Sequence, residues 1–155
     1  MEFDSDAIIS QVEELVEQRQ WPALREVLLP LPAADIALIL SELPEDRLPL
    51  LYRLLPKELA AEVFVEMEPE QQELLIKSFS DTELKEVLDE LYVDDAVDLI
   101  EEMPATVVKR ILQHTDPETR RSVNEILKYP EDSAGSIMTT EFVDLKKNLT
   151  VADAI

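Results

Sequence analysis

The sequence predicts an all-α fold, a right-handed superhelix of about ten short helices, followed by the beginning of an α/β domain. Prolines and polar capping residues divide the first 128 residues into pieces of helix length. Within these pieces, apolar residues recur at i, i+3, i+4 and i+7, which is the spacing of one helix face. Similar segments also recur along the chain, as they do in stacked helical repeats.

The predicted helices follow one another closely, and prolines mark several of their first turns. Proline is tolerated there because its missing N–H would have no intrahelical partner. Residues 80–83 read Ser-Asp-Thr-Glu, the pattern of a capping box, and Asp4 is placed to cap the first helix. The predicted helices span residues 5–19, 22–29, 34–43, 44–55, 57–67, 69–79, 81–92, 94–103, 105–113 and 117–128.

Apolar stripes support these helices and predict one buried face for each. Helices this short are marginal in isolation, so we expect them to stack on their neighbours. Residues 35–44, 58–67 and 95–104 resemble one another, and this loose repeat favours a solenoid; an irregular helical bundle is the alternative. The two clearest stripes are Leu84, Val87, Leu88 and Leu91, and Ala96, Leu99, Ile100 and Met103.

The pattern changes after Lys128. Residues 129–133 are polar and break the helix, and residues 133–136 contain the only glycine. Residues 141–145 predict a short strand, and Thr150 is placed to cap a further helix. Because a strand and the start of a helix cannot bury a core of their own, we expect the chain to be part of a longer protein.

The composition excludes several classes of protein. The 155 residues carry 35 acidic and 14 basic side chains, a net charge of -21, which argues against nucleic-acid binding. One glycine is too few for a phosphate-binding loop, and the lack of cysteine excludes disulfides and thiolate metal sites. No signal peptide or membrane segment is evident, which predicts a cytoplasmic location. His114, the single histidine, has no nucleophile partner, so we expect no enzyme.

The acidic residues are concentrated in one interval. No basic residue lies between Lys85 and Lys109, although this interval carries many carboxylates within helical patterns. On a helical wheel, Asp94, Asp98 and Glu101 lie opposite the apolar stripe of their helix. Asp94 and Asp98 are one turn apart, so their carboxylates are expected to be neighbours on an exposed face.

This acidic face has two interpretations. The simpler one is a solvated surface that aids solubility, with Asp94 as the N-cap of its helix. The functional one is a divalent-cation site, for which oxygen ligands favour Mg²⁺ or Ca²⁺ over zinc. Mg²⁺ retains several waters and suits one or two carboxylates, completed by water or by a facing acidic surface. Glu58 and Glu62 form a further acidic pair at i, i+4.

A resemblance to a known family rests on two segments. Residues 129–142 read YPEDSAGSIMTTEF, which resembles the signature that joins the cytoplasmic N domain to the first CBS domain in MgtE-type magnesium transporters. Residues 93–104 are similar to the Asp-Asp-x-x-Asp helix of that family. The resemblance covers essentially the whole chain, although residues 1–30 match only in general character.

The resemblance implies an N domain over residues 1–128 that stacks like armadillo repeats, a linker over 129–136 and a truncated start of a CBS domain over 137–155. It implies a regulatory domain on the cytoplasmic face of the cell membrane, in a homodimeric transporter. Bound Mg²⁺ would dock this domain onto the CBS domain of the same transporter and gate Mg²⁺ uptake, with residues 130–136 as the hinge.

The same resemblance implies the residues of the site. Asp94 and Asp98 match the acids that share Mg²⁺ with the CBS side, Glu62 matches more loosely, and Glu101 is a lesser candidate. The isolated chain is expected to bind Mg²⁺ weakly or not at all, because the CBS ligands lie beyond it. The alternative is a helical-repeat scaffold resembling part of a flagellar motor switch protein, which would bind another protein.

Overall fold

The computed structural model describes residues 5–130, 132–142 and 150, and the regular secondary structure of these residues consists of helices, without strands. Glu141 and Phe142, the first residues of the predicted strand, are not in a strand. The rest of that strand, the predicted cap Asp4 and the helix expected after Thr150 lie outside the described residues. No helix in the described part is both long and apolar enough to cross a membrane.

The predicted series of short helices is confirmed, with boundaries that differ by a few residues. The elements are α1 (Ser5–Glu17), α2 (Trp21–Leu28), α3 (Ala33–Glu42), the 3-10 helix η1 (Glu45–Arg47), α4 (Leu48–Tyr52), α5 (Lys57–Val65), α6 (Pro69–Ser78), α7 (Asp81–Leu88), α8 (Val93–Glu102), α9 (Ala105–His114) and α10 (Pro117–Ile126).

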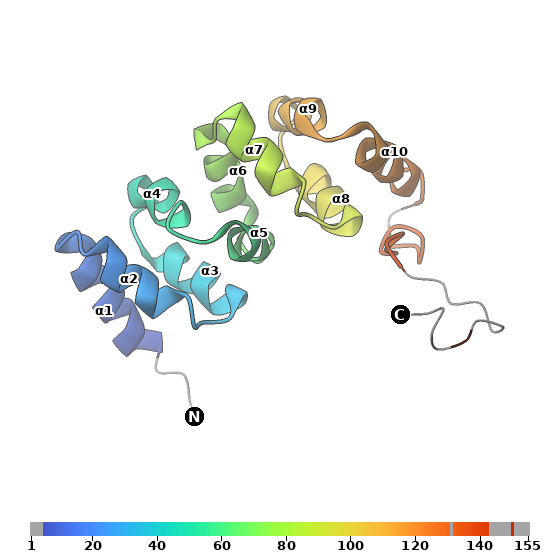
Figure 1. Cartoon of the computed structure of the whole chain (residues 1–155). Coiled ribbons are helices and arrows are strands. Elements are labelled where there is room, and N and C mark those ends of the chain that lie inside the picture. Colours follow the sequence, from blue (N-terminus) through green and yellow to red (C-terminus); the bar gives the residue numbers. More distant parts are fainter. Residues whose placement is uncertain (1–4, 131, 143–149, 151–155) are drawn as a thin grey trace.

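The helices form a stack in which each layer rests on the next. Figure 1 shows α1–α3 at one end of the stack and α8–α10 at the other. Contacts join every second helix: α3 packs on α5, α5 on α7 and α7 on α9, while α8 packs on α10. This nearest-neighbour packing is the pattern of repeat proteins, and it replaces the irregular bundle considered above. The right-handed sense of the superhelix stays a prediction.

Prolines begin the helices in two ways. They occupy the first turn of α2, α4, α6 and α10, and the N-cap of α3, α5 and α9. The single helix predicted over 44–55 is wrong, because the chain forms η1 and then α4. Pro49 lies inside that range and has no N–H to donate to the carbonyl of Glu45, so a continuous α-helix cannot form.

Helix α7 shows both a confirmed cap and a shorter length than predicted. Ser80 Oγ accepts a hydrogen bond from the Glu83 amide at 3.2 Å, and the Ser80 amide donates to Glu83 Oε2 at 2.8 Å, which completes the capping box. The helix ends at Leu88 instead of Tyr92. Leu91 is nevertheless buried with the rest of its stripe, so the predicted face is correct.

The core has two parts. The main cluster extends from Val12 in α1 to Ile111 in α9, and a second cluster lies between α8 and α10. Helix α8 contributes Leu99 to the first and Val97 to the second. The predicted stripe on α8 is buried apart from Ile100, which is half-buried, but the wheel missed Val97 because α10 covers a second side of the helix.

Two buried hydrogen bonds fix α5, which lies next to α8. Tyr52 Oη donates to the carbonyl of Ala60, and Gln72 Nε2 donates to the carbonyl of Phe64, both at 2.8 Å. Burial raises the pKa of the Tyr52 hydroxyl well above its ordinary value, so it remains a donor at any physiological pH. Helices on both sides therefore hold α5 in place.

Candidate cation-binding groove

Helix α8 begins one residue earlier than predicted, which changes the position of its first acids. Tyr92 is the N-cap, and its side chain makes no capping hydrogen bond. Asp94 is the second helical residue, so its predicted role as the N-cap is wrong. Asp94 is half-buried instead of exposed, and its Oδ1 atom is buried with no hydrogen-bond partner among the described residues. An unpaired buried carboxylate oxygen is costly and favours a donor or a cation nearby.

Two adjoining cavities separate α5 and α6 from α8. The smaller has a volume of about 250 Å³ and is lined by Gln72, Asp95 and Asp98 among others. The larger measures about 490 Å³ and is lined by Glu62 and Asp95 among others. Asp95 and Val65 line both cavities, and the two neighbouring cavities together are here called the acidic groove. Its carboxylates are Glu58, Glu62, Glu66, Glu68, Glu90, Asp95, Asp98 and Glu102.

The acidic groove has almost no neutralising charge. Among the described residues, no lysine, arginine or histidine lines either cavity. Glu90 is paired with Lys57, whose Nζ lies 2.9 Å from Glu90 Oε1. Within the described residues, no such ion pair reaches Glu62, Asp95 or Asp98. Carboxylates held this way repel one another and attract cations.

Asp95 is the acidic residue that lines both cavities, and its environment disfavours its charge. Burial raises the pKa of the Asp95 carboxyl above its ordinary value, and the charges of Asp94, Asp98 and Glu141 raise it further. The backbone N–H of Tyr92 opposes this effect. A cation near Asp95 would relieve both the desolvation and the repulsion, because it favours the ionised form.

The predicted residues fall at different places in this groove. Glu62 is exposed and lines the larger cavity, and Asp98 is exposed and lines the smaller one. Asp94 lines neither, and Glu101 is exposed outside both. The sequence analysis missed Asp95. Its signal was the i, i+3, i+7 spacing of Asp95, Asp98 and Glu102, which places three acids on the side of α8 that faces α5.

The chemistry of the groove suits a hydrated hard cation. Its candidate ligands are carboxylate oxygens and the side-chain amide of Gln72. The Oε1 atom of Gln72 is buried and has no hydrogen-bond partner in the described part of the chain. Among the described residues, no three His, Cys, Asp or Glu side chains converge closely enough to hold a metal ion. Mg²⁺ accepts such open arrangements, because it retains waters and needs only one or two carboxylates.

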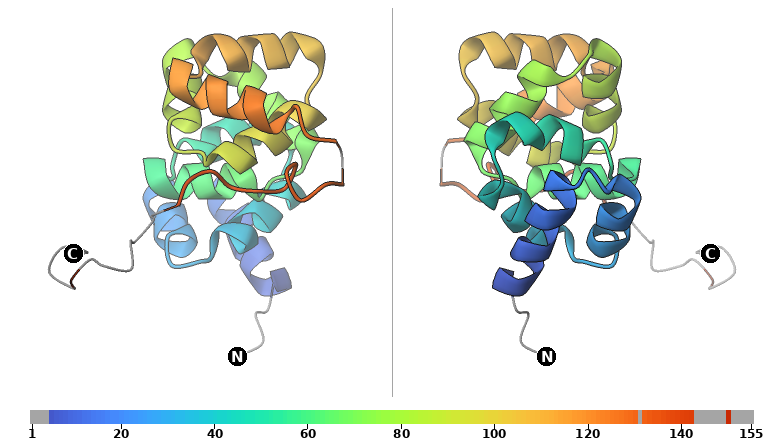
Figure 2. Two further views of the ribbon diagram at one scale, coloured as in Figure 1. Left: turned by 90° about the vertical axis from the view of Figure 1, so that its right-hand side faces the viewer. Right: turned by 90° about the vertical axis from the view of Figure 1, so that its left-hand side faces the viewer.

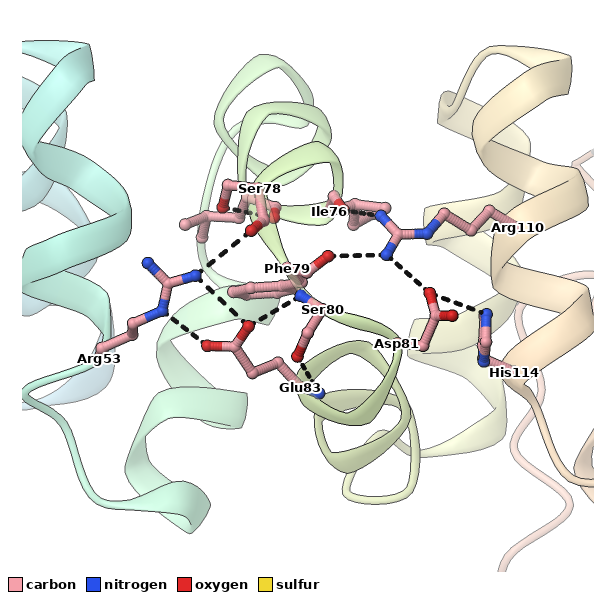
Figure 3. Close-up of polar contacts among 10 residues, drawn as sticks. Arg53, Ile76, Ser78, Phe79, Ser80, Asp81, Glu83, Arg110 and His114 are labelled. Carbon is pink, nitrogen blue, oxygen red and sulfur yellow. Dashed lines mark hydrogen bonds and ion pairs between the residues drawn. The ribbon is translucent and has the colours of Figure 1, made fainter.

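A different acidic region, at the junction of α6 and α7, is fully neutralised (Figure 3). Arg53 Nε donates to Glu83 Oε1 at 2.6 Å, and its Nη2 donates to the Ser78 carbonyl at 3.3 Å. The hydrogen bond from Arg53 is the main reason why the pKa of Glu83 is lowered to about 2. From the other side, Arg110 donates to the carbonyls of Ile76 and Phe79.

His114 belongs to this neutralised junction and not to a catalytic site. It is the last residue of α9, one residue beyond the predicted end of that helix, and its Nε2 lies 3.4 Å from Asp81 Oδ1. Arg110 Nη2 approaches the same oxygen at 3.1 Å. The carboxylates here are occupied by structural partners, which leaves the acidic groove as the candidate site.

A comparison with known families gives the family of the chain. Residues 31–132 match the model of the MgtE intracellular N domain. The chain belongs to this family. All of the acidic groove lies within the matched part of the MgtE N domain, which includes α3 to α10.

Two related transporters are much longer than this chain. The chain is 34% identical over 148 residues to the magnesium transporter MgtE of Thermus thermophilus, and 26% identical over 150 residues to that of Bacillus subtilis. These alignments cover 93% and 97% of this chain but 33% of each relative. The chain therefore spans about a third of the length of these transporters.

Solved structures match over most of the chain. One is the soluble part of a magnesium transporter, with a TM-score of 0.83 at 27% identity, covering 97% of this chain and 60% of that one. Another is the cytosolic domain of the Mg²⁺ channel MgtE in complex with ATP, with a TM-score of 0.75 at 34% identity, covering 87% and 56%. The helical stack thus matches part of the fold of these two solved structures.

Proposed function

We propose that this chain is the Mg²⁺-sensing regulatory domain of a magnesium transporter, and that it gates Mg²⁺ uptake from the cytoplasmic face of the membrane. The observation that carries this proposal is the acidic groove, where Glu62, Asp95 and Asp98 lack basic partners among the described residues. We propose Mg²⁺ as the cation because the relatives of this chain are magnesium transporters. The junction of α6 and α7 supports the distinction, because Glu83 and Asp81 there are paired with Arg53 and Arg110.

Each acidic residue has a proposed role. Glu62 and Asp98 offer exposed carboxylates at the two cavities, and Asp95 lies between them. Asp94 contributes an oxygen that has no other described partner, once its side chain turns toward the ion. Glu101 remains a lesser candidate because it lies outside both cavities. The remaining ligands would be waters and acids of the CBS domain in the same homodimeric transporter.

Electrostatics then links the cation to the position of the domain. In low Mg²⁺, the acidic groove repels the acidic surface proposed to face it, and the two domains stay apart. A bound Mg²⁺ supplies the positive charge that offsets this repulsion. Because the docked arrangement provides more carboxylates to the ion, it has the higher affinity, and rising Mg²⁺ shifts the population toward it. By the same reasoning, the isolated chain binds Mg²⁺ weakly.

The test uses the intact transporter with Asp94→Ala and Asp98→Ala together. We expect these channels to remain open at cytosolic Mg²⁺ concentrations that close the wild type, because the groove loses two ligands. Transport of Mg²⁺ into vesicles, measured against the Mg²⁺ concentration on the cytoplasmic side, gives the comparison. The matched control is Glu13→Ala with Glu17→Ala, an exposed i, i+4 acidic pair on α1 at the far end of the stack (Figure 1).

Two results would argue against the proposal. Unchanged Mg²⁺ inhibition in the α8 double variant would remove these residues from the sensor. An equal loss of inhibition in the α1 control would show that net charge alone, and not the groove, sets the response.

A further inference from the structure

The chain that follows α10 does not leave the helical stack directly. Figure 2 shows this segment turning back across the end of the stack, and its far end contacts the first residue of α8. The turn begins where Gly135 lies against the ring of Tyr129: a Cβ atom at position 135 would be 2.3 Å from Tyr129 Cδ1. The amide of Ser136 donates to the carbonyl of Ser133 at 3.1 Å, which closes the turn. Glycine at this position therefore permits the chain to reverse against an aromatic ring.

An apolar contact holds the middle of the returning segment. Met138 is half-buried and packs against the second core cluster, which α8 and α10 build together. The flexible methionine side chain adapts well to such a gap between two helices. The cluster consists of Val93, Ala96, Val97, Val123 and Ile126.

A polar contact holds its far end. Glu141 Oε2 accepts a hydrogen bond of 2.7 Å from the backbone N–H of Val93, the first residue of α8. The N-cap residue Tyr92 provides no side-chain cap, so Glu141 takes that role from 48 residues further along the chain. A carboxylate at a helix N-terminus is favoured both by the free N–H groups and by the helix dipole.

The same contact brings like charges together. Glu141 interacts unfavourably with Asp95, which also experiences the charges of Asp94 and Asp98. The helix terminus thus attracts Glu141 while the neighbouring acids repel it. A cation on those acids would reduce the repulsion and leave the attraction unchanged.

We infer that residues 133–141 form a strap that latches onto α8 and α10, and that divalent-cation binding at the acidic end of α8 tightens this latch. Because linkage is reciprocal, the latched strap also raises the affinity of those acids for the cation. The identity of the cation as Mg²⁺ rests on the proposed function. When the strap is latched, the chain leaves the helical stack after Glu141 and not at residues 130–136, the predicted hinge.

The first experiment tests the latch in the 155-residue chain without added metal. Glu141→Ala should speed amide hydrogen exchange at Val93 about tenfold, because a charge-assisted hydrogen bond is lost. Exchange should also quicken in residues 136–142. Glu118→Gln, an exposed acid on α10, is the control and should change neither. Unaltered exchange at Val93 in Glu141→Ala would overturn the inference.

The second experiment tests the coupling in the intact transporter. Exchange in residues 136–142 should slow in MgCl₂ relative to NaCl of equal ionic strength, and Glu141→Gln, which keeps an acceptor oxygen without the charge, should abolish this difference. Equal slowing in both salts would reduce the effect to screening and overturn the inference. If Mg²⁺ still closes the channel through Asp94 and Asp98 while exchange in the strap is unaffected, the inference fails and the proposed function stands. If exchange in the strap responds to Mg²⁺ as expected while Mg²⁺ does not close the channel through Asp94 and Asp98, the proposed function fails and the inference stands.

Discussion

The junction of α6 and α7 and the acidic groove use the same side chains in opposite ways. At the junction, Arg53 and Arg110 reach in from the two neighbouring layers, and each satisfies a carboxylate together with helix carbonyls (Figure 3). In the groove, α5 and α8 present carboxylates to one another, and no basic side chain in the described part of the chain lines the space between them. One region binds the layers of the stack together, and the other holds charge that the fold itself does not use.

This difference separates acids that stabilise the fold from acids that remain available to bind a cation. A carboxylate with a bidentate arginine partner stabilises the fold by a charge-assisted hydrogen bond. An unpaired carboxylate in a partly buried groove opposes folding, since it is desolvated and repelled by its neighbours. A chain that retains such acids accepts a cost in stability, which is common at functional sites. The comparison therefore predicts opposite signs for the same kind of substitution in the two regions.

The largest effect is expected for Arg110→Ala at the junction. The carbonyls of Ile76 and Phe79 lose a charged donor and Asp81 loses a cation, so the free energy of unfolding should fall by about 2–3 kcal/mol. Urea denaturation followed by circular dichroism measures this change. Arg121→Ala on α10, an exposed residue of the same type, should stay within about 0.5 kcal/mol of the wild type. Equal effects would show that the arginine contacts do not hold the layers together.

A second prediction concerns the pH dependence of the same junction. The pKa of Glu83 is lowered from 4.5 to about 2, chiefly by its hydrogen bond with Arg53. Its stabilising contribution is therefore complete above pH 4.5 and is lost as the pH falls toward 2. Glu83→Gln should cost about 1 kcal/mol at neutral pH, after allowance for solvent screening. The difference from wild type should shrink in acid, and a constant difference would contradict this origin.

The smallest effect has the opposite sign and lies in the groove. Asp95→Asn should raise the free energy of unfolding by about 0.5 kcal/mol at neutral pH, because the folded state disfavours the charge of Asp95. Asp89→Asn is the matched control, since Asp89 is paired with Lys85 at 2.8 Å on the adjacent helix. It should lower stability by a few tenths of a kcal/mol. If both variants change stability in the same direction, the contrast between paired and unpaired acids fails.

Much of the fold could be predicted from local features of the sequence. Prolines in first turns, the Ser80 capping box and the stripe around Leu84 are short-range signals, and each places a helix or a buried face correctly. The helix break at Pro49 could also have been predicted from the sequence, because a proline five residues into a helix removes a backbone hydrogen bond.

The errors at the site have a different origin, since they depend on packing between distant segments. The wheel of α8 assumed one buried side, but α10 covers a second one and leaves Asp94 half-buried. Asp95 becomes central only because α5 lies opposite it. The cap from Glu141 to Val93 joins residues 48 positions apart, and no residue pattern near Val93 predicts it. Patterns within one helix cannot reveal such contacts.

The most direct test is the distance between the acidic groove and the domain proposed to follow it, measured in the intact transporter. The absence of cysteine from this chain allows one spin label to be placed on α10 without background from these residues. Adding MgCl₂ should shorten the distance to a second label in the following domain, and NaCl of equal ionic strength should not. Asp94→Asn with Asp98→Asn should lose most of this change. A distance that is indifferent to Mg²⁺ in the unmodified protein would contradict a role for the groove as a cation-dependent docking surface.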